Sequence, residues 1–157
     1  MSERLSKIQN SVHDMIAAMP DSQARTKFCV HSGGVSLVCA LLAAKRGLDA
    51  ELASAIGLLH DIYAIAKGTY EAHDVLGAEM AAEILARQGG FSREEIRAVH
   101  SAILRHDALD DFSHGHYDEL LKDADVLQPF YQNMQSLEAV SPQRRARMER
   151  LLKELGV

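Results

Sequence analysis

Helical periodicity along nearly the whole chain is the feature that most restricts its fold. Apolar residues recur every three or four positions in almost every segment, and no segment shows the alternation typical of a strand. The first such stripe consists of Leu5, Ile8, Val12, Ile16 and Met19. Its end at Pro20-Asp21-Ser22 also supplies a cap for the next helix. The pattern predicts an all-α protein.

Capping and breaking residues divide the chain into about seven helices. Gly47, Gly68 and Gly89-Gly90 are predicted helix ends, and Ser92 with Glu95 forms a capping box. After the first stripe, the expected helices are Gln23 to Arg46, Ala50 to Lys67, His73 or Asp74 to Gln88, Ser92 to about His106 or Asp107, Tyr117 to Asn133, and Ser141-Pro142 to Leu155. A length of 157 residues without a long linker predicts one domain, 1–157, folded as a single helical bundle.

Composition and charge exclude several classes of protein. A formal charge of −5 argues against general nucleic-acid binding, which needs a basic patch. The longest near-apolar run, Val35 to Ala44, is too short to span a bilayer, and the residues after Met1 do not resemble a signal peptide. Cys29 and Cys39 form no CxxC pair, so we expect reduced, mostly buried thiols in a cytoplasmic protein that has no membrane partner.

His60-Asp61 is the strongest chemical signal in the sequence. It directly follows the apolar run Ala53 to Leu59. Neighbours on a helix point about 100° apart, so these two side chains can share one metal ion only if both reach around it from a helix end. His31 lies on the preceding predicted helix and Asp125 on a later one. A single His-Asp pair is more often a surface hydrogen bond, but the other two residues favour a metal site.

These four residues offer two nitrogen and two oxygen ligands. Such a set is too hard for a structural zinc site, which prefers thiolates, and it leaves coordination positions open. A hydrolytic metal needs open positions for a water and for a phosphoryl oxygen. Mn²⁺, Fe²⁺, Co²⁺, Ni²⁺, Zn²⁺ and Mg²⁺ all remain candidates, because ligand type alone does not choose between them.

The order His31, His60-Asp61, Asp125 resembles the H…HD…D pattern of the HD-domain superfamily of metal-dependent phosphohydrolases. Leu58-Leu59-His60-Asp61-Ile62 is similar to its central motif, and Asp123-Ala124-Asp125-Val126-Leu127 to its closing motif. The resemblance covers about residues 27–127. It implies an all-α fold, an active site at a helix junction and hydrolysis of a phosphate ester.

Two further histidines resemble a subset of that superfamily that binds two metals. His73-Asp74-Val75-Leu76-Gly77-Ala78 is similar to its H-x-x-x-G-A segment, and Ala102-Ile103-Leu104-Arg105-His106 to its A-I-x-x-H segment. With His73 and His106 added, Asp61 would bridge two ions. The alternative is that His73 caps its helix and His106 lies at a helix C-terminus, where a cation is favoured.

The sequence departs from the family pattern at the expected phosphate-binding positions. Many members have a lysine three residues after the aspartate, whereas here Lys67 comes later. Phe28 stands where an arginine often precedes the first histidine, and Lys27 lies four residues before His31 on the same helix face. Lys67 and Lys27 are therefore the candidate substrate-binding residues.

Other polar residues have simpler interpretations. Asp123 is expected to orient a ligand histidine or to lie in solvent, Lys122 to be solvated unless it contacts a phosphate, and the arginines of the last helix to form a solvated face. Gly33-Gly34 indicates a kink, a close approach to the backbone or tight helix packing. Small residues from Ala78 to Ala86 can pack inside the domain or between subunits of a homo-oligomer.

The predicted function is metal-dependent hydrolysis of a nucleotide or another small phosphate ester by a metal-activated water. His31, His60, Asp61 and Asp125 would hold the principal ion, His73 and His106 a second, and Asp61 would also orient the water. The alternatives are a non-catalytic module with a regulatory role that binds metal or nucleotide, and a di-iron oxygenase of the kind found among a few relatives.

Overall fold

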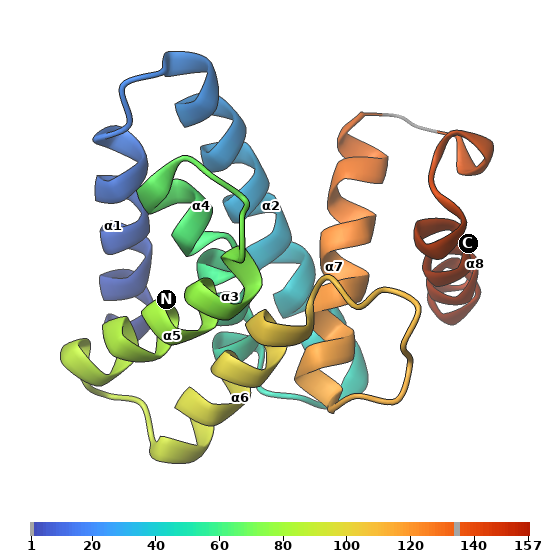
Figure 1. Cartoon of the computed structure of the whole chain (residues 1–157). Helices are drawn as coiled ribbons and strands as arrows, with labels where there is room; N and C mark the ends of the chain where they lie inside the picture. Colours follow the sequence, from blue (N-terminus) through green and yellow to red (C-terminus); the bar gives the residue numbers. More distant parts are fainter. Residues whose placement is uncertain (1, 134–135) are drawn as a thin grey trace.

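Helices form the whole architecture of the computed structural model, which describes residues 2–133 and 136–157 (Figure 1). No strand occurs in these two ranges. The all-α prediction is therefore confirmed. The elements are α1 Glu3–Ala17, α2 Ser22–Arg46, α3 Ala50–Leu59, α4 Ile62–Lys67, α5 His73–Gln88, α6 Arg93–Arg105, α7 His116–Gln132, the 3-10 helix η1 Leu137–Ala139, and α8 Pro142–Leu155.

The helix ends follow the capping signals. Ser92 and Glu95 form the expected capping box at the start of α6, and Asp49 accepts hydrogen bonds from the first backbone amides of α3. Gly47 and Gly68 take the left-handed conformation that ends α2 and α4, with φ of 69° and 70°.

The prediction of one continuous helix from Ala50 to Lys67 is wrong, because the segment forms two helices. α3 ends at Leu59, and α4 begins at Ile62. Asp61 leaves the helical conformation, with φ −100° and ψ 18°, and its carboxylate makes no cap on α4 because it faces a cluster of histidines. The His60-Asp61 pair therefore stands at a helix end, the one place from which adjacent side chains can converge on a single ion.

The packing of α2 against α3 and α7 places it at the centre of the fold (Figure 1). It meets α3 so closely that a Cβ on Gly57 would lie 2.6 Å from the Ser36 Cα atom. On the side toward α7, a Cβ on Gly34 would lie 2.7 Å from the Gln128 side chain, whereas Gly33 faces open space. Of the three interpretations of the glycine pair, tight packing holds for Gly34.

Among the described helices, α2 alone is long and apolar enough to cross a membrane by length and composition. In this fold it instead contributes Phe28, Val35, Cys39 and Leu42 to the core. Its outer side exposes the apolar residues Val30, Leu37 and Leu41. Cys29 is also exposed, so the expectation of mostly buried thiols holds only for Cys39.

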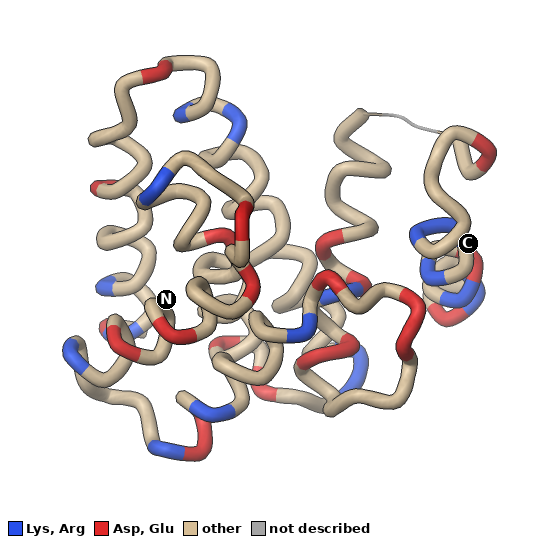
Figure 2. Tube along the Cα trace, in the orientation of Figure 1, with Lys and Arg blue, Asp and Glu red and all other residues tan. Residues whose placement is uncertain are grey.

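Buried charges hold α8 against α7. The Arg147 guanidinium is fully buried and donates to Glu119 at 2.9 Å and to Asp123 at 3.0 Å. Asp123 also accepts from Arg46 at 2.7 Å, and the buried Lys122 donates to Glu119 at 2.9 Å. Three expectations are therefore wrong: Lys122 is not solvated, Asp123 neither orients a ligand histidine nor lies in solvent, and the basic residues along α8 (Figure 2) are not all on a solvated face.

Candidate metal centre

The first cluster of ligand atoms joins α2, the turn between α3 and α4, and α7. The His31 Nε2 atom lies 3.1 Å from the His60 Nε2 atom and 3.2 Å from the Asp125 Oδ1 atom. His60 Nε2 is 3.6 Å from the same Asp125 oxygen. The Oδ2 atom of Asp61 lies 3.7 Å from His31 Nε2 and 3.6 Å from His60 Nε2. The structure thus brings together the four residues of the predicted principal site.

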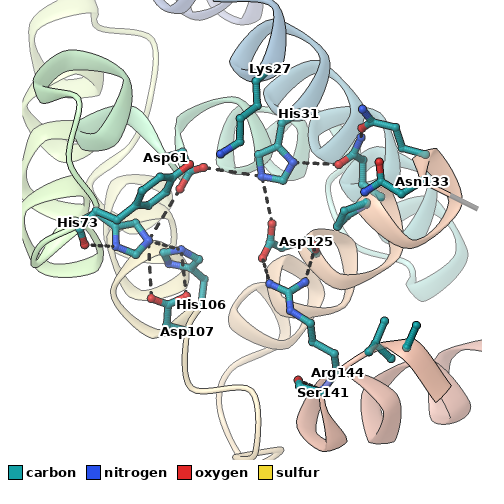
Figure 3. A pocket seen from close by; sticks show the side chains of 16 residues that line it. Lys27, His31, Asp61, His73, His106, Asp107, Asp125, Asn133, Ser141 and Arg144 are labelled. Carbon is teal, nitrogen blue, oxygen red and sulfur yellow. Dashed lines mark hydrogen bonds and ion pairs between the residues drawn. The ribbon is translucent and has the colours of Figure 1, made fainter. Parts of the chain in front are cut away.

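The second cluster lies on the other side of Asp61 (Figure 3). The Nε2 atoms of His73, from α5, and His106, from the end of α6, are 3.2 Å apart. Asp61 turns its other oxygen, Oδ1, to 3.8 Å from His73 Nε2. Asp107, which the sequence interpretation missed, places carboxylate oxygens 3.6 Å from His73 Nε2 and 3.7 Å from His106 Nε2. Its position directly after His106 was the available signal.

All four histidines present Nε2 to the clusters because Nδ1 is engaged elsewhere. The Nδ1 atoms of His60, His73 and His106 lie within hydrogen-bond distance of the backbone carbonyls of Gly57, Tyr70 and Ile103, at 2.9, 2.9 and 2.6 Å. The Nδ1 atom of His31 meets the Gln128 Oε1 atom at 2.8 Å. When Nδ1 donates to these oxygens, the Nε2 lone pair is free, which is the arrangement that metal-binding histidines adopt.

The spacing of the ligand atoms fits bound metal ions. Donors that each lie about 2.1 Å from one ion are about 3 to 3.5 Å apart at neighbouring coordination positions. The closest contacts within both clusters have this spacing. Two of the groups that can hold an ion are His31, His60 and Asp61, and Asp61, His73 and His106. Imidazole and carboxylate ligands suit a divalent transition metal.

The histidines and carboxylates of the first cluster shift one another's pKa values. Burial lowers the pKa of His31. The Asp125 and Asp61 carboxylates and the hydrogen bond with Gln128 together outweigh burial, so the pKa ends above its ordinary value. Burial also lowers the pKa of His60, and there the nearby carboxylates do not reverse the effect. Although burial raises the pKa of Asp125, the hydrogen bond from His31 and the neighbouring histidines hold it well below its usual range.

Residues of both clusters, all but the buried His60, line one cavity of about 690 Å³. Lys27, one of the two candidate substrate-binding residues, lines this cavity, with its Nζ atom 5.4 Å from the centre of the Tyr70 ring. Lys67 is exposed at the end of α4 and is not among the described residues that line it.

Two further lining residues, Tyr70 and Arg144, were not predicted. Burial and the nearby carboxylates raise the pKa of Tyr70 to about 12, so its phenol stays protonated. Tyr70 lies three residues before His73 in the chain, which was a weak signal for its position. No spacing pattern pointed to Arg144.

Comparison with models of known protein families gives a match. The family model described as HD domain matches residues 29–139, more than half of the chain. No curated protein and no solved structure matches the chain.

Proposed function

Since the chain belongs to the HD domain family, whose members are commonly metal-dependent phosphohydrolases, we propose that it hydrolyses a nucleotide or another small phosphate ester. The observation that carries the proposal is that Asp61 turns one oxygen to each of two histidine clusters in the same cavity. Paired ions held in this way are typical of phosphatases and nucleases, where they clamp the attacking and leaving oxygens of an in-line displacement.

In the proposed mechanism, some residues would bind metal ions and others would orient the water or bind the substrate. His31, His60, Asp61 and Asp125 would hold the principal ion, and His73, His106 and Asp61, with Asp107 beside them, a second. A bound divalent ion supplies Lewis acidity that makes a water more acidic and polarises a phosphoryl oxygen. Asp61, buried between the clusters, orients the attacking water through its carboxylate, and Lys27 from α2 contacts the substrate's phosphate.

The test is hydrolysis of chromogenic phosphate esters and of a nucleotide panel. Metal-stripped protein is supplied in turn with Mn²⁺, Fe²⁺, Co²⁺, Ni²⁺, Zn²⁺ or Mg²⁺. We expect turnover that metal restores and that Asp61→Ala lowers by at least about 1,000-fold, since both ions depend on this residue. The matched control is Asp14→Ala, because His13-Asp14 repeats the same dipeptide on the exposed side of α1. It should leave the activity unchanged.

The other outcomes point to other functions. Tight metal binding without turnover of any ester would favour a non-catalytic module, as the position of Lys67 outside the cavity also does. Iron binding with a spectral change that depends on dioxygen would favour an oxygenase. Absence of metal binding would contradict the site itself.

Location and assembly are also proposals. The free thiols of Cys29 and Cys39 favour a cytoplasmic location, where cysteines stay reduced. Ala78 and Ala81 are buried within the domain and cannot contact a second subunit. Any contact between subunits through the small residues of α5 would use exposed ones such as Ala86.

A further inference from the structure

One wall of the cavity comes from a part of the chain that follows the family match. Ala139 marks the end of the match, and Val140, Ser141 and Arg144 lie beyond it. In Figure 3, Arg144 reaches from the start of α8 to the side of Asp125 away from His31. The cavity therefore contains a cation that the family pattern does not supply.

The contact between Arg144 and Asp125 is loose. Its Nη2 atom is 3.7 Å from the Asp125 Oδ2 atom, and its Nη1 atom reaches the Asp125 backbone oxygen only at 3.5 Å. The histidines face the other oxygen of this carboxylate, Oδ1. A guanidinium has five N–H donors, and these long contacts use few of them. The Arg144 side chain is 37% exposed. Donors of Arg144 thus remain available to a ligand in the cavity.

The backbone that carries Arg144 is firmly held. One turn further along α8, the buried Arg147 donates to Glu119 and Asp123 of α7 and to the Leu109 and Asp111 carbonyls. Asp123 is two residues before Asp125 on the same helix. This anchor fixes the start of α8 beside the first cluster, so Arg144 needs little reorganisation to meet an anion there.

Lys27 approaches from the opposite wall, on α2 (Figure 3). Three carboxylates line the cavity, those of Asp61, Asp107 and Asp125. One divalent ion together with Lys27 and Arg144 already outweighs them, and a second ion increases the positive excess. A lining of this charge favours a ligand with more than one negative charge.

We propose that Arg144 and Lys27 bind the terminal phosphate of a phosphomonoester from opposite sides, an inference that rests on the proposed function and names its substrate class. The planar fork of arginine suits two oxygens of a phosphate, and lysine acts as a point charge. A phosphodiester, with a single negative charge and no terminal phosphate, would bind more weakly.

The test measures binding of inorganic phosphate to Mn²⁺-loaded protein by calorimetry at pH 8, with dimethyl phosphate as the singly charged probe. We expect Arg144→Gln to weaken phosphate binding at least about tenfold and Arg144→Lys to weaken it less. Bound Mn²⁺ per chain should stay unchanged. Arg150→Gln, an exposed arginine on the same helix, is the matched control and should bind phosphate as the unaltered protein does.

Two results would overturn the inference. One concerns the binding of phosphate. The inference fails if Arg144→Gln binds phosphate as tightly as the unaltered protein, or if the unaltered protein binds phosphate no more tightly than dimethyl phosphate. The other is a loss of Mn²⁺ in Arg144→Gln, which would make Arg144 a partner of Asp125 alone. Phosphate binding that depends on Arg144 but comes without turnover of any ester would uphold this inference and contradict the proposed function, so the two can fail separately.

Discussion

His106 tests whether the second cluster binds an ion. It is buried at the end of α6, and its Nε2 atom points at His73 rather than at the first cluster. We predict that the anaerobically purified protein contains about two metal ions per chain and that His106→Ala lowers this to about one. Metal analysis with protein quantitation measures it. A value near one in the unaltered protein, unchanged in His106→Ala, would rule out the second ion.

His31 makes metal binding depend on pH. Burial lowers the pKa of His31, but the nearby carboxylates and Gln128 together raise it above its ordinary value of 6.5, so in the metal-free protein the ring keeps its proton to a higher pH than a free histidine does. An ion must displace that proton, because only neutral imidazole ligates. The apparent affinity should therefore rise with pH from about 6.5 upward, by about tenfold per unit for one proton, until the raised pKa is passed.

Titration calorimetry in buffers of different ionisation enthalpy measures this proton release directly. An affinity that stays constant across the range, with no proton released, would contradict the prediction. His60 adds little to the effect, since burial lowers its pKa and keeps it neutral.

At the scale of single residues, the sequence predicted which candidate ligands lie together better than it predicted ion pairs. His31, His60 and Asp125 carry recognisable neighbours and spacing, and the structure brings them together. The burial of Asp123 and Lys122 has no such signal, because a charge is buried only where a partner from a distant segment meets it. Arg147 supplies that partner for Asp123 from 24 residues away. Such pairings cannot be read from helical periodicity.

Gly57 determines how closely α3 can approach α2. A Cβ at this position would lie 2.6 Å from backbone atoms of Ser36, which cannot move without shifting α2. We predict that Gly57→Ala lowers the free energy of unfolding by about 1–3 kcal/mol or more, the usual cost of overpacking. It should also weaken metal binding, because His60 Nδ1 pairs with the Gly57 carbonyl.

Gly33→Ala is the matched control, because Gly33 lies within α2 and faces open space. Removing a helix-interior glycine there should raise stability by about 0.5–1 kcal/mol. Urea denaturation of the two variants measures both effects. Equal changes in the two variants would show that Gly57 has no special packing role.

Helix ends were the most predictable elements, and the break at His60-Asp61 the least. Caps such as Ser92 and Asp49 depend on contacts within three residues, so the sequence contains the whole signal. The break at Asp61 depends on histidines from α2 and α5, and no glycine or proline marks it. Local propensity favoured one continuous helix, and the contacts of the site overrode it.

Across the whole molecule, a network of buried charges joins the C-terminal helix to the rest. We predict that Arg147→Ala lowers the free energy of unfolding by about 3–5 kcal/mol, because it leaves the buried Glu119 and Asp123 without this partner. Arg150→Ala, on the exposed side of α8, loses only the contact of its guanidinium with the Phe112 ring and should change it by no more than about 1 kcal/mol. Chemical denaturation distinguishes them. A small effect of Arg147→Ala would mean that α8 is held mainly by apolar contacts such as Met148 and Leu151.

The division of the cavity between two stretches of chain has a consequence for how such a protein diversifies. Every histidine and carboxylate of the two clusters precedes residue 126, while the wall with Val140, Ser141 and Arg144 follows the family match. In the proposed site, the residues that would hold the ions and Arg144 thus lie in separate blocks, while Lys27 belongs to the first of them. Substitutions in the C-terminal block that keep Arg147 would change this wall while α8 stays anchored to α7, so this segment is where recombination, or a protein engineer, would vary the substrate of the proposed site.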